Sequence, residues 1–112
     1  MSTEKKIEKI MELAEKQKID KIVKFVSEKD AQLRAAVARA LALIKNDESY
    51  NALVTLTHDH DMAVRKEAVT SLGELGMASA ITHIMYAMDS TDDPDFKAAC
   101  LAAHEKLRHL ES

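Results

Sequence analysis

The sequence predicts an all-α protein: a right-handed alpha-alpha superhelix, or solenoid, of about three helical hairpins preceded by an N-terminal cap helix. One helix-forming stretch, residues 61–76, recurs 31 residues upstream and 32 residues downstream, and another apolar helical stretch precedes each copy. The composition, 46% hydrophobic but only 4% aromatic, with two Gly and one Pro, is typical of packed helices. A period of this size indicates repeats that each bury their apolar face on the next.

The central stretch carries the signals of a complete helix. Asp61 stands where an N-cap carboxylate accepts the first free backbone N–H groups, and Gly76 stands where a left-handed residue ends a helix. Between them the apolar residues fall at helical spacing on one face: Val64, Ala68, Leu72 and Leu75. We therefore expect a helix that begins after Asp61 and ends at Gly76.

Both flanking copies keep this spacing. The upstream copy begins at Asp30 and places Leu33, Val37, Leu41 and Ile44 on the same face. The downstream copy follows Asp93-Pro94, an arrangement that starts helices well, and places Phe96, Cys100, His104 and Leu107 there. With the helices that precede them, these copies predict repeats over about 18–47, 48–77 and 78–112. Cys100 aligns with Val37 and Ala68, so we expect it to be buried.

The two ends of the chain are predicted to differ. Residues 1–17 read as a charged helix with a thin apolar stripe, the second helix of an incomplete unit, which closes the N-terminal end of the solenoid. A membrane-surface helix is the less favoured interpretation, because its polar face balances acids against bases. At the other end we expect Leu101, Leu107 and Leu110 to be uncovered, so that self-association through the C-terminal helix is an alternative.

Composition narrows the class of protein. A chain of 112 residues suits one domain, and no apolar run approaches the roughly 20 residues that span a membrane. A single Cys and the lack of a signal-peptide pattern favour a cytoplasmic protein. The formal net charge is −3, from 16 basic and 19 acidic residues without a basic cluster, which argues against nucleic acid as a partner.

The pattern Asp-x-x-Val-Arg-x-x-Ala-x-x-x-Leu-Gly-x-Leu-Gly at 61–76 resembles HEAT repeats, and the short period is similar to the HEAT-like class of phycocyanobilin lyase subunits. The resemblance covers nearly the whole chain. It implies a charge ladder in which the acids Asp30, Asp61 and Asp93 face the bases Arg34, Arg65 and Lys97 between neighbouring units. The alternative is that the bases form a row that holds an acidic partner.

The resemblance also implies a non-catalytic protein-interaction module or scaffold that holds an unidentified partner along the second helices. The side chains we expect at that surface are Arg39, Lys66, Thr70, Ala102 and Glu105. We expect no cofactor and no catalytic residue, since the chain lacks a nucleophile elbow and a phosphate-binding loop.

The alternative function is that of a metal-binding protein or an accessory enzyme component, lyase-like or hydroxylase-like, in which histidines bind the metal. His58 and His60 form a His-Asp-His-Asp turn with two aspartates, and His83 lies in the next unit. A metal site needs three or four convergent ligands, and such a turn also makes ordinary caps. Hydroxylases built on the same repeats hold iron with several His-Glu pairs, whereas this chain has one, at His104.

Overall fold

The computed structural model describes residues 2–110, and within this range the chain is entirely helical, with no strand. The helices are α1 (Thr3–Glu15), α2 (Ile19–Ile22), the 3-10 helix η1 (Val23–Phe25), α3 (Ala31–Leu41), α4 (Asp47–Leu56), α5 (Met62–Leu75), α6 (Ala80–Met88) and α7 (Pro94–Arg108). The predicted all-α class is confirmed.

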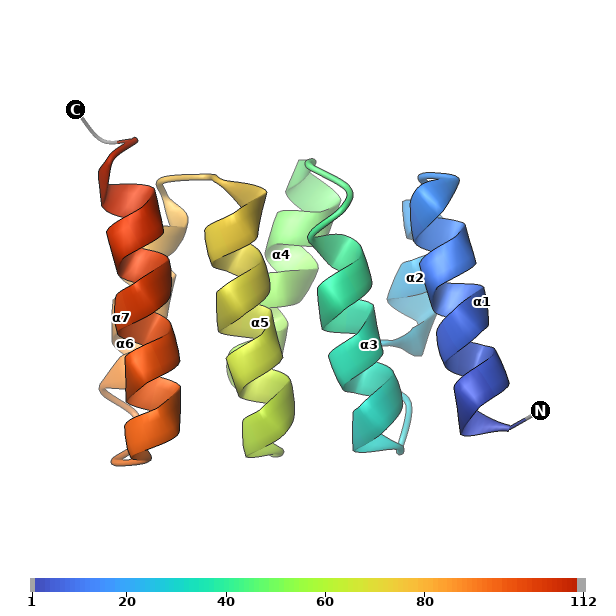
Figure 1. Ribbon diagram of the computed structural model, residues 1–112, viewed down its shortest axis with the longest axis horizontal. Helices are drawn as coiled ribbons and strands as arrows, with labels where there is room; N and C mark the ends of the chain where they lie inside the picture. Colours follow the sequence, from blue (N-terminus) through green and yellow to red (C-terminus); the bar gives the residue numbers. More distant parts are fainter. Residues whose placement is uncertain (1, 111–112) are drawn as a thin grey trace.

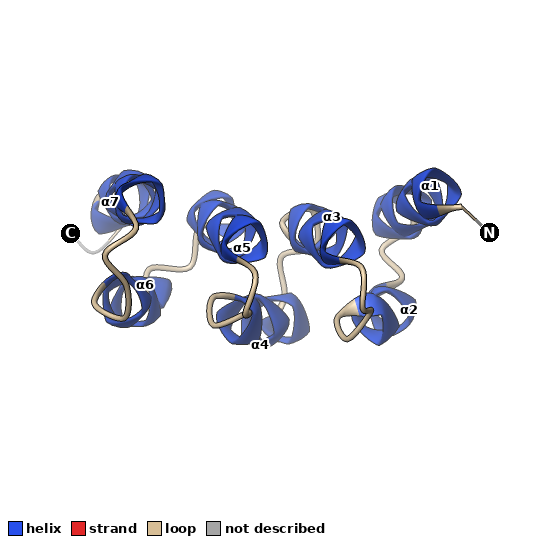
Figure 2. Ribbon diagram, turned by 90° about the horizontal axis from the view of Figure 1, so that it is seen from below, coloured by secondary structure: helices blue, strands red, loops and turns tan. Residues whose placement is uncertain are grey.

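The helices form a slab two layers thick, whose Cα atoms span 42 × 29 × 16 Å. Helices α1, α3, α5 and α7 stand side by side in one layer, and α2, α4 and α6 form the other (Figures 1 and 2). We call these the front layer and the back layer. Neighbouring front helices pack directly on one another, whereas α4 packs on α3 and α5, and α6 packs on α5 and α7. The back helices α4 and α6 therefore pack mainly on the front helix that follows each of them in the chain, α5 and α7 (Figure 2).

Helix ends are set by local chemistry that the sequence displays. Asp61 accepts hydrogen bonds from the N–H groups of Ala63 and Val64, and Gly76 ends α5 at a φ of 79°, where a residue with a Cβ would be strained. Pro94 occupies the first turn of α7 behind its N-cap, Asp93. These predicted helix boundaries are confirmed.

The core runs between the two layers from end to end. The predicted apolar face of α5 is buried, and so are its counterparts in α3 and those at Phe96, Cys100 and Leu107 of α7, whereas His104 is half-buried. Each fully buried Val, Leu, Ile or Phe side chain among them contributes about 1.5–3 kcal/mol through removal of apolar surface from water. One expectation is wrong: Leu107 is fully buried rather than uncovered. Its position repeats those of Ile44 and Leu75, which also face the core between the layers rather than the end of the solenoid.

Candidate partner-binding surfaces

Repeats 1 and 2 are joined by a buried ion pair. Arg34 of α3, only 4% exposed, donates from Nε and Nη2 to both carboxylate oxygens of Asp59, at 2.8 and 3.0 Å. Its Nη1 donates to the carbonyl oxygens of Glu28 and Lys29 at 2.7 and 2.9 Å, and Nη2 lies 3.3 Å from Nε2 of His60. A guanidinium has five N–H donors, and four of them have an oxygen acceptor here, while the fifth belongs to the nitrogen that lies beside His60. Arg34 therefore connects the second helix of one repeat to the turn of the next.

Arg65 holds repeats 2 and 3 together without an acid. Its Nε donates to the carbonyl oxygen of Thr57 at 2.8 Å, and its Nη2 donates to Oγ of Ser90 at 2.6 Å and to the carbonyl oxygen of Ala87 at 3.4 Å. The guanidinium carbon lies 4.6 Å from the centroid of the Phe96 ring, a cation–π arrangement. The third base of the series, Lys97, reaches Asp92 at 3.9 Å.

These contacts correct the predicted charge ladder. The three aspartates are N-caps: Asp30 accepts from the N–H of Gln32, Asp61 from those of Ala63 and Val64, and Asp93 from that of Phe96. An N-cap carboxylate points at its own helix, so it is not available to the base one turn later. The acid that Arg34 does bind, Asp59, stands two residues before the cap, in the turn where sequence analysis considered metal ligands.

Asp59 is held as a carboxylate by its surroundings. Burial raises its pKa, but the hydrogen bonds from Arg34 and from the backbone N–H of Asp61, with the charge of Arg34, outweigh burial and leave the pKa below its ordinary value. A lowered folded-state pKa adds stability that is present above the unfolded-state pKa and is lost as the pH falls through the folded-state pKa.

We therefore expect the stability difference between the native chain and an Asp59→Asn variant to be largest near neutral pH. It should narrow as the pH falls below about 4, where unfolded aspartate begins to protonate. Urea unfolding at a series of pH values measures this, with Asp20→Asn, at an exposed position of α2, as the control. A difference that stays constant down to the acid limit would contradict it.

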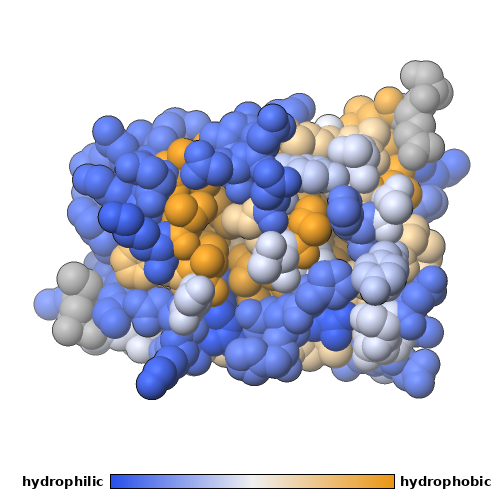
Figure 3. Space-filling model, turned by 180° about the vertical axis from the view of Figure 1, so that it is seen from behind, coloured by the Kyte–Doolittle hydropathy of each residue, from blue (hydrophilic) through white to orange (hydrophobic). Residues whose placement is uncertain are grey.

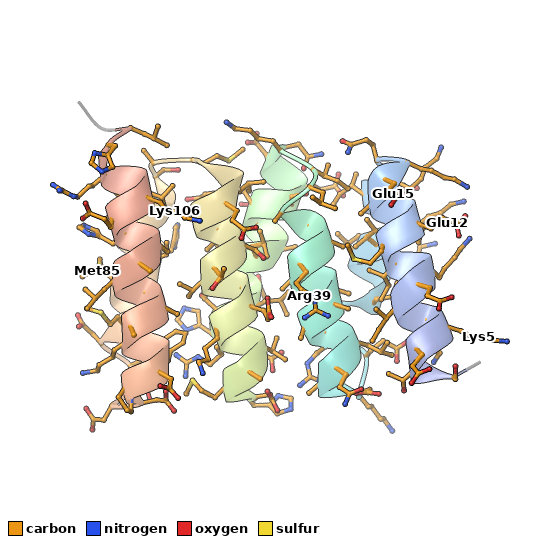
Figure 4. All side chains as sticks on the ribbon, in the orientation of Figure 1. Lys5, Glu12, Glu15, Arg39, Met85 and Lys106 are labelled. Atoms are coloured by element: carbon orange, nitrogen blue, oxygen red, sulfur yellow. The ribbon has the colours of Figure 1, made fainter. Side chains whose placement is uncertain are left out.

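The front layer places most of the predicted partner-binding residues on its surface. Arg39, Thr70, Ala102 and Glu105 are exposed, and Lys66 is half-buried. Charges on this face pair across neighbouring helices: Arg39 with Glu67 at 3.3 Å and Lys66 with Asp95 at 3.7 Å. Figure 4 shows Arg39 on this face of α3. Each of these two interhelical charge pairs thus contains one residue, Arg39 or Lys66, that was predicted to bind a partner.

Between α5 and α7 the front face has a shallow hollow of about 60 Å³, lined by Thr70, Ala99, Ala102, Ala103 and Lys106. The two helices approach closely because Gly73 has no side chain. A Cβ on Gly73 would lie 3.1 Å from Cβ of Ala103, closer than most such contacts. Small residues therefore leave this hollow between the two closely packed helices.

The back layer is more open and shows apolar surface between its helices (Figure 3). A groove of about 370 Å³ between the end of η1 and α4 is lined by Val26, Ala52, Leu56 and Thr55, with His58 and His60 at its edge. At the N-terminal end, a pocket of about 450 Å³ has Leu13 and Phe25 among Lys9, Lys21, Lys24 and Glu28.

The four histidines considered as ligands do not converge. His58 meets the ring of Tyr86 edge-on at 5.5 Å, and His83 meets that of Tyr50 at 6.0 Å. His60 lies against Arg34, and His104 is in α7. Among residues 2–110 no group of three His, Cys, Asp or Glu side chains is placed to hold a metal ion. Burial raises the pKa of the Cys100 thiol to about 11, so this thiol is protonated near neutral pH.

Comparison with known proteins identifies the repeat. A family model of HEAT repeats matches residues 19–104, which is more than half of the chain, so the resemblance drawn from residues 61–76 is confirmed. A comparison with curated proteins gives no match. None of the helices described in residues 2–110 is long and apolar enough to cross a membrane.

Proposed function

Because the chain belongs to the HEAT-repeat family, whose domains are generally non-catalytic protein-interaction modules, we propose that it binds a protein partner across the front face of α3, α5 and α7. The observation that carries this proposal is the row of exposed residues Arg39, Thr70 and Ala102, which occupy equivalent positions on three adjacent helices. Solenoids present such rows as extended binding surfaces.

The chemistry of the face favours a partner segment that lies across the helices. Alanine and threonine leave room for a backbone to approach near α5 and α7, while Arg39, Glu67 and Lys66 offer charged groups of both signs at the joints. Such mixed charges favour register and specificity more than affinity. The histidines carry no metal-dependent proposal, since His58 and His83 contact tyrosine rings and His60 lies beside the Arg34–Asp59 pair.

Bulky substitutions on the front face test the proposal. A chain carrying Thr70→Arg and Ala102→Arg should lose a partner that the native chain captures from the extract of the source organism. Both positions are exposed, so the fold should stay intact, as circular dichroism would show. The matched control carries Thr55→Arg and Thr82→Arg, at exposed positions of the back helices α4 and α6, and it should retain the partner. Equal capture by both variants, or loss from the control alone, would place binding elsewhere, and capture of nothing by the native chain would remove the proposal's support.

A further inference from the structure

The second helix of each repeat has a stripe of side chains that packs on the following repeat. In α5 this stripe is Arg65, Val69 and Gly73, four residues apart and therefore on one face of the helix. Arg65 bonds to the end of α6 and to Ser90, Val69 is fully buried, and Gly73 receives Ala103 of α7. We call these positions the stacking stripe.

The stacking stripe of α7, 32 residues later, consists of Lys97, Leu101 and Glu105. Leu101 is 54% exposed, whereas Val69 and Ala38 at the same position of the other repeats are fully buried. No residue in the range 2–110 packs over this stripe to the extent seen in the earlier repeats. Met85 of α6 lies at the same outer edge of the slab (Figure 4). This edge therefore exposes a leucine between charged residues, at a position where the other repeats bury an apolar side chain.

The stripe is unsuited to another repeat stacked in the regular way. Regular stacking of α7 on α5 depends on Gly73, where even a Cβ would lie 3.1 Å from Ala103. The equivalent residue of α7 is Glu105, whose carboxylate needs space and a cation. The opposite end of the slab is a poor match, because the outer edge of α1 carries Lys5 and Glu12 (Figure 4), and the apolar pocket at that end is surrounded by Lys9, Lys21, Lys24 and Glu28. These features argue against head-to-tail association of copies.

The stripe is complementary to itself when reversed. It reads cation, leucine, anion at spacings of four residues, so an antiparallel copy reads anion, leucine, cation. We propose that two copies of this chain associate through α7 in an antiparallel pair, with the two Leu101 side chains in contact at a two-fold axis. Lys97 of each copy then lies opposite Glu105 of the other. A contact of this kind closes on itself and produces a dimer rather than a fibre.

Existing intrachain contacts are compatible with this arrangement. Glu105 accepts hydrogen bonds from Arg108 at 2.6 and 3.0 Å, and Lys97 lies 3.9 Å from Asp92. Glu105 Oε1 also lies 3.5 Å from Nε2 of His109. A carboxylate has about four acceptor sites, so Lys97 of the second copy can join these intrachain partners. The interface then has an apolar centre and a charged rim.

Complementary charge variants of the full chain test the arrangement. Sedimentation equilibrium over a range of concentrations should show a dimer for the native chain. Lys97→Glu and Glu105→Lys should each weaken self-association by at least about tenfold, because both place like charges opposite one another twice. An equimolar mixture of these two variants should form heterodimers, since every facing pair is then of opposite sign. Recovery on mixing also shows that neither variant has merely unfolded.

A matched pair of leucines supplies the control. Leu101→Glu should abolish the dimer, whereas Leu43→Glu should not, although Leu43 is 53% exposed and therefore equally accessible. A native chain that stays monomeric up to its solubility limit would overturn the proposal. So would a mass that grows beyond the dimer with concentration, which indicates head-to-tail growth, or a mixture of the two charge variants that remains monomeric.

Discussion

Replacing Arg34 by alanine is expected to lower the free energy of unfolding by about 3–5 kcal/mol, the range found when one partner of a buried ion pair is removed. The substitution leaves the buried carboxylate of Asp59 without its counter-charge and removes the donors to the carbonyl oxygens of Glu28 and Lys29. The substitution thus removes hydrogen bonds to residues of both repeat 1 and repeat 2. Urea unfolding followed by far-UV circular dichroism at neutral pH measures it.

Two variants give this expectation its control. Arg39→Ala removes an arginine from the same helix, but its pair with Glu67 is exposed, so the cost should not exceed about 1 kcal/mol. Replacing Arg34 and Asp59 together by Met and Leu should cost less than Arg34→Ala alone, because no buried charge is then left unpaired. Equal losses of unfolding free energy for Arg34→Ala and Arg39→Ala would show that burial does not determine how much the Arg34–Asp59 pair contributes to stability.

The fold was predictable because its signals are local. The spacing of Val64, Ala68, Leu72 and Leu75 requires only helical geometry, and the caps at Asp61 and Gly76 act within one turn of the chain. Recurrence of the same signals at a fixed period then implied stacking. The sequence did not predict that the first helix of repeat 1 is divided into the short α2 and η1. A helix of four residues depends on packing, here against α1 and α3, more than on helix propensity.

The sequence predicted which charged side chains are exposed better than it predicted which residues they pair with. Periodicity indicated that Arg39 and Thr70 lie on the surface, but the pairing of Arg39 with Glu67 depends on how far α3 and α5 are shifted along each other. Likewise, only the path of the turn decides that Asp59 rather than Asp61 meets Arg34. The sequence did contain a signal for this contact: the His-Asp-His-Asp turn has a second aspartate, Asp59, in addition to the N-cap. In the structure Asp59 binds the arginine of the preceding repeat.

Replacing Phe96 by alanine is expected to destabilise the protein by about 3–5 kcal/mol, as is usual when a buried aromatic side chain is truncated. Phe96 is fully buried at the start of α7, and its ring also supports the guanidinium of Arg65. Its removal therefore leaves a cavity in repeat 3 and loosens the arginine that joins repeat 3 to repeat 2. Thermal and urea unfolding of the variant measure the loss.

A double-mutant cycle separates the cavity from the contact with Arg65. Phe96→Leu should recover part of the lost stability, because leucine fills much of the space but lacks the π face. The losses for Phe96→Leu and Arg65→Met should then couple by about 0.5–2 kcal/mol when the two substitutions are combined. If they simply add, the ring contributes through volume alone. The bonds from Arg65 to Thr57, Ala87 and Ser90 would then account for its role at this joint.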